Sequence, residues 1–342
     1  MSNIYNHELV YIRENPDADI TNKSVVWIND AFDANDLHSR LRGRMPAYIV
    51  SSFFNYIDVA NTIIYTAPLW VANNTRQFII PNLPTNQTYQ TRHLFNFVIN
   101  KKQVNRFLCM KFVELFRLSH YDYTWSGVDS NFDMTDIIDE LHHLGKEEKL
   151  LTEDQQSLIL SPIQIAPKWL PRPSEETLSN GYITNDTSNW PWNHGLNEIF
   201  CSSVTSLITE SLSFQKGAVF TEKTSYAILG KTFPLWIGGG ANQAQHFEEM
   251  GFDVFHDVID HSYQYYDTLI ERCYYAFKLN MRILTDYEHA SKIRKSMMPR
   301  LERNQHLIKN KQIDCFCQQR IGQWPEDLQQ AINDELKNWI EG

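Results

Sequence analysis

The chain has 342 residues, of which 42% are hydrophobic and 21% are charged, and its formal net charge is −10. This composition is typical of a globular protein and excludes a disordered, collagen-like or low-complexity chain. The acidic balance argues against a protein that coats nucleic acid non-specifically, because such proteins are basic overall. At about 100–200 residues per domain, the length predicts two domains or one large one.

The five cysteines have no metal-binding spacing, since only Cys315 and Cys317 are close together. We therefore expect free thiols in a reducing compartment, the cytoplasm. The N-terminus carries no basic region followed by an apolar run. No apolar stretch reaches about 18 residues. We thus expect neither a secretory signal nor a membrane span.

The first part of the chain predicts an α/β unit. Short apolar and β-branched runs predict strands over residues 24–28, 47–50 and 62–65. Asp30 follows the first run, and the acidic stretch 33–36 predicts the start of a helix. Residues 81–91 are polar and contain two prolines, which is typical of a linker.

A second alternation of strands and helices follows this linker. We predict strands over 94–99, 200–208, 233–237 and 252–255, and helices over 104–118, 221–229 and 241–250. Gly251 is the expected C-cap of the last of these helices. The stretch 119–195 is polar and irregular, with one predicted helix near 134–144, while 263–284 and 325–340 are predicted to be helical. Strands that alternate with helices favour a doubly wound parallel sheet.

Thr221-Glu222-Lys223 places a carboxylate and an ammonium in the first turn of a predicted helix, where doubly wound folds bind ligands. Glu222 could accept hydrogen bonds from a ribose diol, and Lys223 could neutralise a diphosphate at the helix N-terminus. The same residues fit a simple capping arrangement, with Thr221 as the N-cap and Glu222 favoured by the helix dipole. Both interpretations remain open at this stage.

Gly238-Gly239-Gly240 lies between a predicted strand and a predicted helix. It lacks the spacing of a dinucleotide-binding turn or of a P-loop. We interpret it as a tight turn that lets the backbone approach a ligand, or as a plain connection between the two elements.

Several stretches follow one another in a fixed order: Thr209–Ser211, Phe220–Thr224, Lys231–Leu235, Gly251–Asp253 and Ile259–Tyr263, preceded by a strand-and-helix opening over Phe95–Leu118. This series resembles a glycosyltransferase-like family common in bacteriophages and giant viruses, and for a chain that a bacteriophage encodes the expected cytoplasm is that of the host cell. The series also resembles the nucleotide-binding half of fucosyltransferase-type enzymes. The resemblance covers roughly residues 94–285, about half of the chain, and skips the proline-rich middle.

The resemblance implies an α/β, GT-B-like fold with two Rossmann-like domains that face a cleft, and a helical C-terminal tail. The expected units are an acceptor-side domain over 1–90, a nucleotide-sugar-binding domain over 91–290 and the tail over 291–342. The implied function is a glycosyltransferase that moves a sugar from a nucleotide-sugar to an acceptor hydroxyl. The open alternatives are a non-catalytic nucleotide-sugar-binding module and a virion scaffold.

The resemblance also implies roles for individual residues. Glu222 would hold the donor ribose, while Lys223 and Arg106 would hold the diphosphate and act in catalysis. The other residues implied at the donor site are Thr221, Lys102, Glu210, Ser211 and Gly238. Fucosyltransferase-type enzymes carry a tyrosine three positions before the glutamate, where this chain has Val219. The nucleotide, UDP or GDP, is therefore left open.

We expect no metal and no cofactor beyond the nucleotide-sugar, because arginine, lysine and helix dipoles can neutralise a leaving diphosphate. The Asp-x-Asp signature Asp17-Ala18-Asp19 falls in a predicted loop, and the histidines share no metal spacing. His261 either lines a pocket or is structural.

The general base must lie near the acceptor hydroxyl, and in a two-domain cleft it normally comes from the N-terminal half. Asp30 ends the first predicted strand and is the preferred candidate, ahead of Asp33, Asp36 and Asp58. Each of these is also compatible with an ordinary surface carboxylate.

A basic segment near the C-terminus bears on the acceptor. It contains Lys292, Arg294, Lys295, Arg300 and Arg303, with Glu302 as its only acid up to residue 311. Such a segment could follow a phosphate backbone, which fits a hydroxymethylated base in bacteriophage DNA as the acceptor. It could equally be a solvated helical face, and glycan or lipid-linked acceptors remain alternatives.

Overall fold

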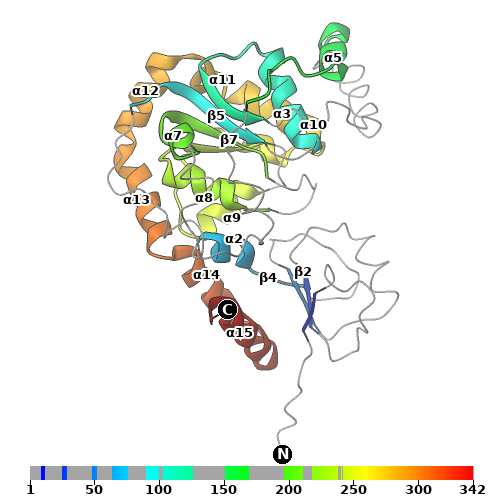
Figure 1. Ribbon diagram of the computed structural model, residues 1–342, viewed down its shortest axis with the longest axis vertical. Helices are drawn as coiled ribbons and strands as arrows, with labels where there is room; N and C mark the ends of the chain where they lie inside the picture. The colour runs from blue at the N-terminus through cyan, green and yellow to red at the C-terminus, as the bar shows by residue number, and fades with distance from the viewer. Residues whose placement is uncertain are drawn as a thin grey trace, which may run out of the picture.

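The computed structural model describes residues 9–11, 25–28, 48–51, 64–75, 90–99, 103–125, 151–168, 196–210, 218–237, 240 and 242–341. Within these residues the chain is a mixed α/β structure with two parallel sheets and a helical C-terminal region (Figure 1).

The first sheet is formed by the N-terminal strands. In order across the sheet these are β1 (Leu9–Tyr11), β2 (Val25–Ile28), β3 (Tyr48–Ser51) and β4 (Ile64–Thr66), all parallel. The short helix α2 (Leu69–Asn74) follows β4. Ile49 and Val50 of β3 are fully buried, as expected for apolar, β-branched residues in a parallel sheet.

The second sheet contains several buried strands. Its strands are β5 (His93–Ile99), β6 (Tyr121–Trp125), β7 (Ser203–Ile208) and β8 (Phe233–Trp236), and they lie in the order β6-β5-β7-β8. The chain therefore adds strands first on one side of β5 and then on the other. The resulting switch point, between β5 and β7, is the place where open α/β sheets bind ligands, outside the carboxyl ends of the strands.

Helices cover both faces of this sheet. They are α3 (Val104–Leu115), α7 (Leu196–Cys201), α8 (Glu222–Leu229), α9 (Gln243–Glu249) and α10 (Leu269–Leu279), with α5 (Glu153–Leu160) packed on α3 and a 3-10 turn η5 (Ser262–Tyr265) before α10. Phe95 and Phe97 of β5 pack in one core with α3 and α10. Val98 of the same strand faces the other core, with Trp236 and α8. This alternation follows from the period of two along a strand.

The C-terminal helices connect the two sheets. They are α11 (Met281–Thr285), α12 (Tyr287–Ser296), α13 (Met298–Lys309), α14 (Gln312–Ile321) and α15 (Glu326–Glu341). Figure 1 shows α12 and α13 (orange) running beside the second sheet, and α14 and α15 continuing toward the first. The Tyr48 hydroxyl of β3 donates to the Asp327 carboxylate, with oxygen distances of 2.9 and 3.0 Å. Trp324 packs on Tyr65 of β4.

Most predicted elements are confirmed within a few residues. The predicted strand over 200–208 is wrong in its first part, because α7 extends to Cys201 before β7 begins. Helix α7 packs so closely on the end of α8 that a Cβ added at Gly230 would lie 2.7 Å from the Phe200 Cβ. A glycine is thus required at this contact.

The predicted strand over 252–255 is also wrong. Asn304 of α13 bonds both the N–H and the C=O of Asp253, at 2.9 and 2.7 Å, so a side chain takes the place of a strand partner. The helix predicted over 263–284 is divided into η5, α10 and α11. Strand β6 and helix α5 lie in the stretch expected to be irregular. Gly251 has the left-handed φ of +92° expected of a C-cap.

Three other expectations are not addressed by the fold. The helix near 134–144 and most of the linker over 81–91 lie outside the described residues. The two sheets are separate, and the change from one to the other falls between α2 and β5. The domain boundary at residue 90 stays a prediction. All five cysteines are free thiols, as expected.

Candidate functional site

The candidate site lies at the switch point of the second sheet. Helix α3 follows β5 and helix α8 follows β7, so the N-termini of both helices meet at the carboxyl ends of the two central strands. Backbone N–H groups in the first turn of a helix lack partners within the helix and attract negative charge. Two such ends beside one switch point favour an anionic ligand.

Glu210 connects the two helix N-termini. Its carboxylate is fully buried and accepts hydrogen bonds from the Thr221 N–H at 3.0 Å, from the Thr221 hydroxyl and from the Thr224 hydroxyl at 2.7 Å, all at the start of α8. Its backbone carbonyl accepts a bond of 2.9 Å from the Asn105 amide of α3. Glu210 therefore sets the spacing between the two helices.

Burial raises the pKa of Glu210 above its usual value, and Lys223 and the hydrogen bonds from Thr221 and Thr224 oppose this rise. Thr224 is itself fixed, since the Trp236 indole N–H of β8 donates to its hydroxyl at 3.0 Å. The carboxylate of Glu210 is thus fully engaged in holding α8, and it faces protein groups rather than an open pocket. This differs from the pocket-lining role that the resemblance implies.

Glu222 and Lys223 form an ion pair at the N-terminus of α8, with 3.1 Å between Nζ and Oε1. The Glu222 side chain keeps 27% of its surface exposed and the Lys223 side chain 10%. Although burial acts to raise the pKa of Glu222, the neighbouring Lys223 and Arg106 bring the net shift below its usual value. Glu222 is therefore an ionised and accessible acceptor.

Arg106 supplies a second cation from α3. Its side chain is buried, and burial lowers its pKa, while Glu222 and Glu210 act in the opposite direction. The charges of Arg106, Lys223 and Glu222 thus influence one another across the gap between the two helices. A guanidinium and an ammonium at adjacent helix N-termini are the groups that proteins use for phosphate oxygens.

The capping interpretation of the same turn also holds. The Thr221 hydroxyl accepts from the Lys223 N–H at 3.4 Å, and Glu222 stands in the first turn of α8. Thr221 is therefore the N-cap that the sequence predicts. Capping accounts for Thr221, but it does not account for Arg106, whose charge on α3 lowers the pKa of Glu222.

Several buried polar atoms at this edge have no hydrogen-bond partner among the described residues. They include the side-chain oxygens of Gln103 and Asn105, at the start of α3, and of Thr209, at the end of β7. Buried polar groups normally have a partner, so a group of them beside two helix N-termini is consistent with a polar ligand or water.

The structure brings together five of the predicted donor-site residues: Arg106, Glu210, Thr221, Glu222 and Lys223. The other three, Lys102, Ser211 and Gly238, lie outside the described residues, and so does the candidate general base Asp30. Sequence reasoning missed Asn105 and Thr224. Their signal is their position in the first helical turn after a buried strand, where polar side chains face the ligand edge.

The basic segment over 292–311 is divided between structural and exposed side chains. Arg294 is buried and bonds the carbonyls of Lys231, Cys201 and Gly230 and the Thr91 hydroxyl, at 2.8–3.1 Å. It is thus occupied by the protein itself. Lys292, Lys295 and Arg303 are exposed.

Arg300 is paired with two aspartates. Its guanidinium contacts the Asp253 and Asp257 carboxylates, both at 2.6 Å. The segment therefore offers fewer available cations to a phosphate backbone than its sequence suggests.

Among the described residues, no three histidine, cysteine, aspartate or glutamate side chains are grouped so that they could hold a metal ion. Within the same ranges, no helix combines the length and apolar character needed to cross a membrane. Comparison of the chain with family models, curated proteins and solved structures finds no match.

Proposed function

We propose that the chain is a glycosyltransferase that transfers a sugar from a nucleotide-sugar to an acceptor hydroxyl. The observation that carries this proposal is the meeting of Arg106, Lys223 and Glu222 at the switch point of a parallel sheet, with two helix N-termini beside them. An activated sugar joined to a diphosphate needs cations for the phosphates and an acceptor for the ribose hydroxyls, and this site has both.

Each of these groups has a role in the proposed reaction. Lys223 and Arg106 bind the diphosphate, and Glu222 accepts hydrogen bonds from the ribose. When the bond between the anomeric carbon and the phosphate oxygen breaks, its electron pair stays on the diphosphate, and the two cations stabilise the growing charge. The acceptor oxygen forms the new bond and gives its proton to a base. Asp30 as that base stays a prediction from the sequence.

The arrangement of the two sheets is consistent with a GT-B-like enzyme. The sheets are separate, and the C-terminal helices return from the second to the first, where Tyr48 bonds Asp327. In such an arrangement the acceptor side belongs to the first unit and the donor side to the second. The acceptor itself, whether a hydroxymethylated base, a glycan or a lipid-linked sugar, stays a prediction.

The proposal is tested by incubating the full chain with a panel of UDP- and GDP-sugars, while donor hydrolysis and thermal stabilisation are recorded. We expect one nucleotide-sugar to raise the melting temperature and to be hydrolysed slowly. Binding without hydrolysis or transfer to any acceptor would favour a non-catalytic nucleotide-sugar-binding module. If no donor binds, the glycosyltransferase proposal fails and the scaffold alternative is favoured.

A further inference from the structure

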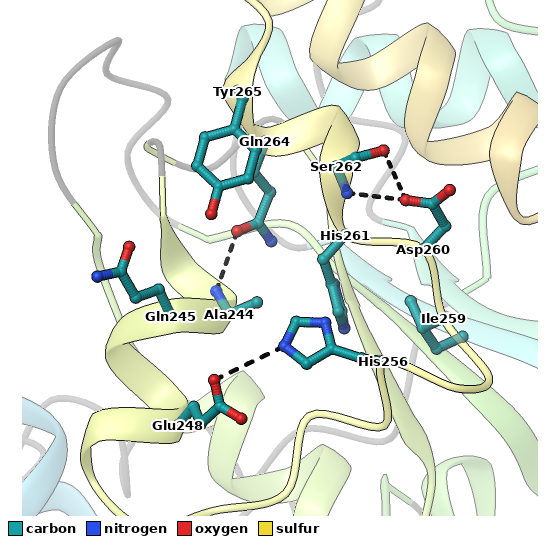
Figure 2. Close-up of a pocket in the computed structure, with 10 residues that line it drawn as sticks. All are labelled: Ala244, Gln245, Glu248, His256, Ile259, Asp260, His261, Ser262, Gln264 and Tyr265. Carbon is teal, nitrogen blue, oxygen red and sulfur yellow. Dashed lines mark hydrogen bonds and ion pairs between the residues drawn. The ribbon is translucent and has the colours of Figure 1, made fainter.

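A cavity of about 530 Å³ lies between α9 and the segment that leads into η5. Ten of the described residues line it, and Figure 2 shows how they are placed. Tyr265 stands on one side above Gln245 and Ala244 of α9, and His256 and His261 stand on the other, with Glu248 below. A volume of this size falls within the usual range of small-molecule sites, roughly 300–1,000 Å³.

The lining disfavours an anionic ligand. The described residues that form it include the carboxylates of Glu248 and Asp260 and no lysine or arginine. A diphosphate would meet like charge here, whereas at the switch point it meets Lys223 and Arg106. The cavity therefore differs in chemistry from the proposed donor site. A metal ion is also disfavoured, because the described residues contain no group of three ligands.

The cavity presents hydrogen-bond acceptors on its exposed side chains. His261 is not one of them, because its ring donates from Nε2 to the Val254 carbonyl at 2.9 Å and its Nδ1 is buried, without a partner among the described residues. The Glu248 side chain is 60% exposed, and its carboxylate lies 3.7 Å from His256. An acceptor-rich lining favours a ligand that carries several O–H or N–H donors.

One large ring is available for stacking. Tyr265 keeps 66% of its surface exposed, which is unusual for an aromatic residue of its size. The remaining apolar lining is small, since Ile259 is fully buried and Ala244 presents a single methyl group. A flat nucleobase would bind better between two apolar surfaces, one on each face of the ring. A sugar ring needs one apolar surface on one side and hydrogen-bonding groups around its edge, as found here.

From these contacts we propose that the cavity beside α9 is a binding site for an uncharged saccharide, with Tyr265 as its stacking surface and Glu248 and Gln245 as its hydrogen-bonding groups. The proposal rests on the lining of this cavity and not on the donor site. The two sites are nevertheless close in space, because the Gln243 amide, next to Ala244, donates to the carbonyl of Val219, two residues before Thr221.

The test is a calorimetric titration of the full chain with phosphate-free ligands: glucose, galactose, mannose, N-acetylglucosamine and maltotriose, and separately uridine, guanosine and spermidine. We expect at least one saccharide to bind more tightly than the nucleosides and the polyamine. Tyr265→Ala should weaken that binding roughly five- to tenfold, since stacking on an aromatic ring is worth about 1 kcal/mol.

Two matched variants distinguish the contribution of the Tyr265 ring to saccharide binding from that of the Glu248 carboxylate. Tyr265→Phe keeps the ring and should bind almost as the wild type does, whereas Glu248→Gln should bind more weakly. Both positions are exposed, so the fold should tolerate the changes. Lys223→Ala, in the donor site, should leave saccharide binding unchanged even if nucleotide-sugars no longer bind.

Three outcomes would overturn the proposal. The first is the absence of saccharide binding at tens of millimolar. The second is binding that Tyr265→Ala and Glu248→Gln leave intact, which would put the saccharide elsewhere. The third is tighter binding of a nucleoside or of spermidine than of any saccharide.

Discussion

The carboxylate of Glu210 bonds both the backbone N–H and the hydroxyl of Thr221, the N-cap of α8. The backbone carbonyl of Glu210 at the same time holds Asn105 of α3. Two helices that start after different strands are thereby fixed to one residue. A defined distance between Arg106 on α3 and Lys223 on α8 is what recognition of a diphosphate requires.

Replacing Glu210 tests this connection. Glu210→Ala leaves three buried donors, the Thr221 N–H and the hydroxyls of Thr221 and Thr224, without their acceptor. Each buried unsatisfied group costs about 1–3 kcal/mol, so we expect the free energy of unfolding to fall by about 3 kcal/mol or more. Urea denaturation measures this change.

Two control variants accompany Glu210→Ala, one at the same position and one at an exposed carboxylate. Glu210→Gln retains one acceptor oxygen and the side-chain volume, and it should lose less stability than Glu210→Ala. Glu302→Ala removes an exposed carboxylate and should be nearly neutral. If Glu210→Ala unfolds at the same urea concentration as the wild type, Glu210 does not hold the two helices together.

Glu222→Ala tests donor binding. The Glu222 side chain is partly exposed, and its loss leaves α8 capped by Thr221, so we expect little effect on the melting temperature. Hydrogen bonds from a ribose to a carboxylate are worth about 1.5–3 kcal/mol, so donor affinity should fall by that amount. A variant that melts much earlier but binds the donor normally would show that Glu222 serves the helix alone.

Arg294→Ala tests whether the buried arginine of the basic segment stabilises the fold, in contrast to the exposed lysines of the same segment. Arg294 bonds the ends of α7 and α8 and the Thr91 hydroxyl, and its loss leaves several buried carbonyls unpaired. We expect the free energy of unfolding to fall by about 3 kcal/mol or more. The exposed neighbour Lys292→Ala should change it by less than about 0.5 kcal/mol. Equal stability of the two variants in urea would contradict a structural role for the hydrogen bonds of Arg294.

Local chemistry explains which elements the sequence could predict. The start of α8 is predicted well because its signal, a threonine cap followed by Glu222, lies within three residues. Strand β6 is missed although Tyr121, Tyr123 and Trp125 alternate with period two, since polar sequence surrounds it. The run that contains Phe200 is ambiguous because a short apolar stretch fits a buried helix as well as a strand.

The candidate site was only partly accessible from the sequence, for the same reason. Lys223 could be proposed because it lies in the first turn of a helix after a predicted strand, whereas Arg106 was implied only by the family resemblance. The role of Glu210 depends on contacts with Asn105, which is 105 residues away, and with Thr224. Strand order decides such contacts, and no local pattern records that β7 lies beside β5.

His261 predicts a dependence of stability on pH. Burial lowers its pKa from 6.5 to about 4, so the folded chain keeps the ring neutral over a range in which the unfolded chain protonates it. The resulting stability is fully present above pH 6.5 and is lost as the pH falls toward 4. The loss over this window should reach about 3 kcal/mol.

Urea midpoints between pH 7 and pH 4 measure this dependence. His261→Gln retains a donor for the Val254 carbonyl but cannot titrate, so its stability should fall less over the window. An unchanged slope in His261→Gln would assign the pH dependence to other groups.

Lys223→Ala separates catalysis from binding. If Lys223 meets the diphosphate, it stabilises charge that grows as the sugar departs, and it acts more on the transition state than on the bound donor. We expect kcat to fall by roughly 10²–10³-fold and donor affinity to fall less. Arg106→Ala should behave similarly, and Lys223→Arg should recover part of the rate because it restores the charge. Lys231→Ala, which removes a lysine paired with Glu302, should leave both constants unchanged.

A Lys223→Ala enzyme that loses donor affinity but keeps kcat would show that Lys223 binds the donor and the transition state equally. The diphosphate would then lie away from the N-terminus of α8, and the roles given to Lys223 and Arg106 would have to be withdrawn.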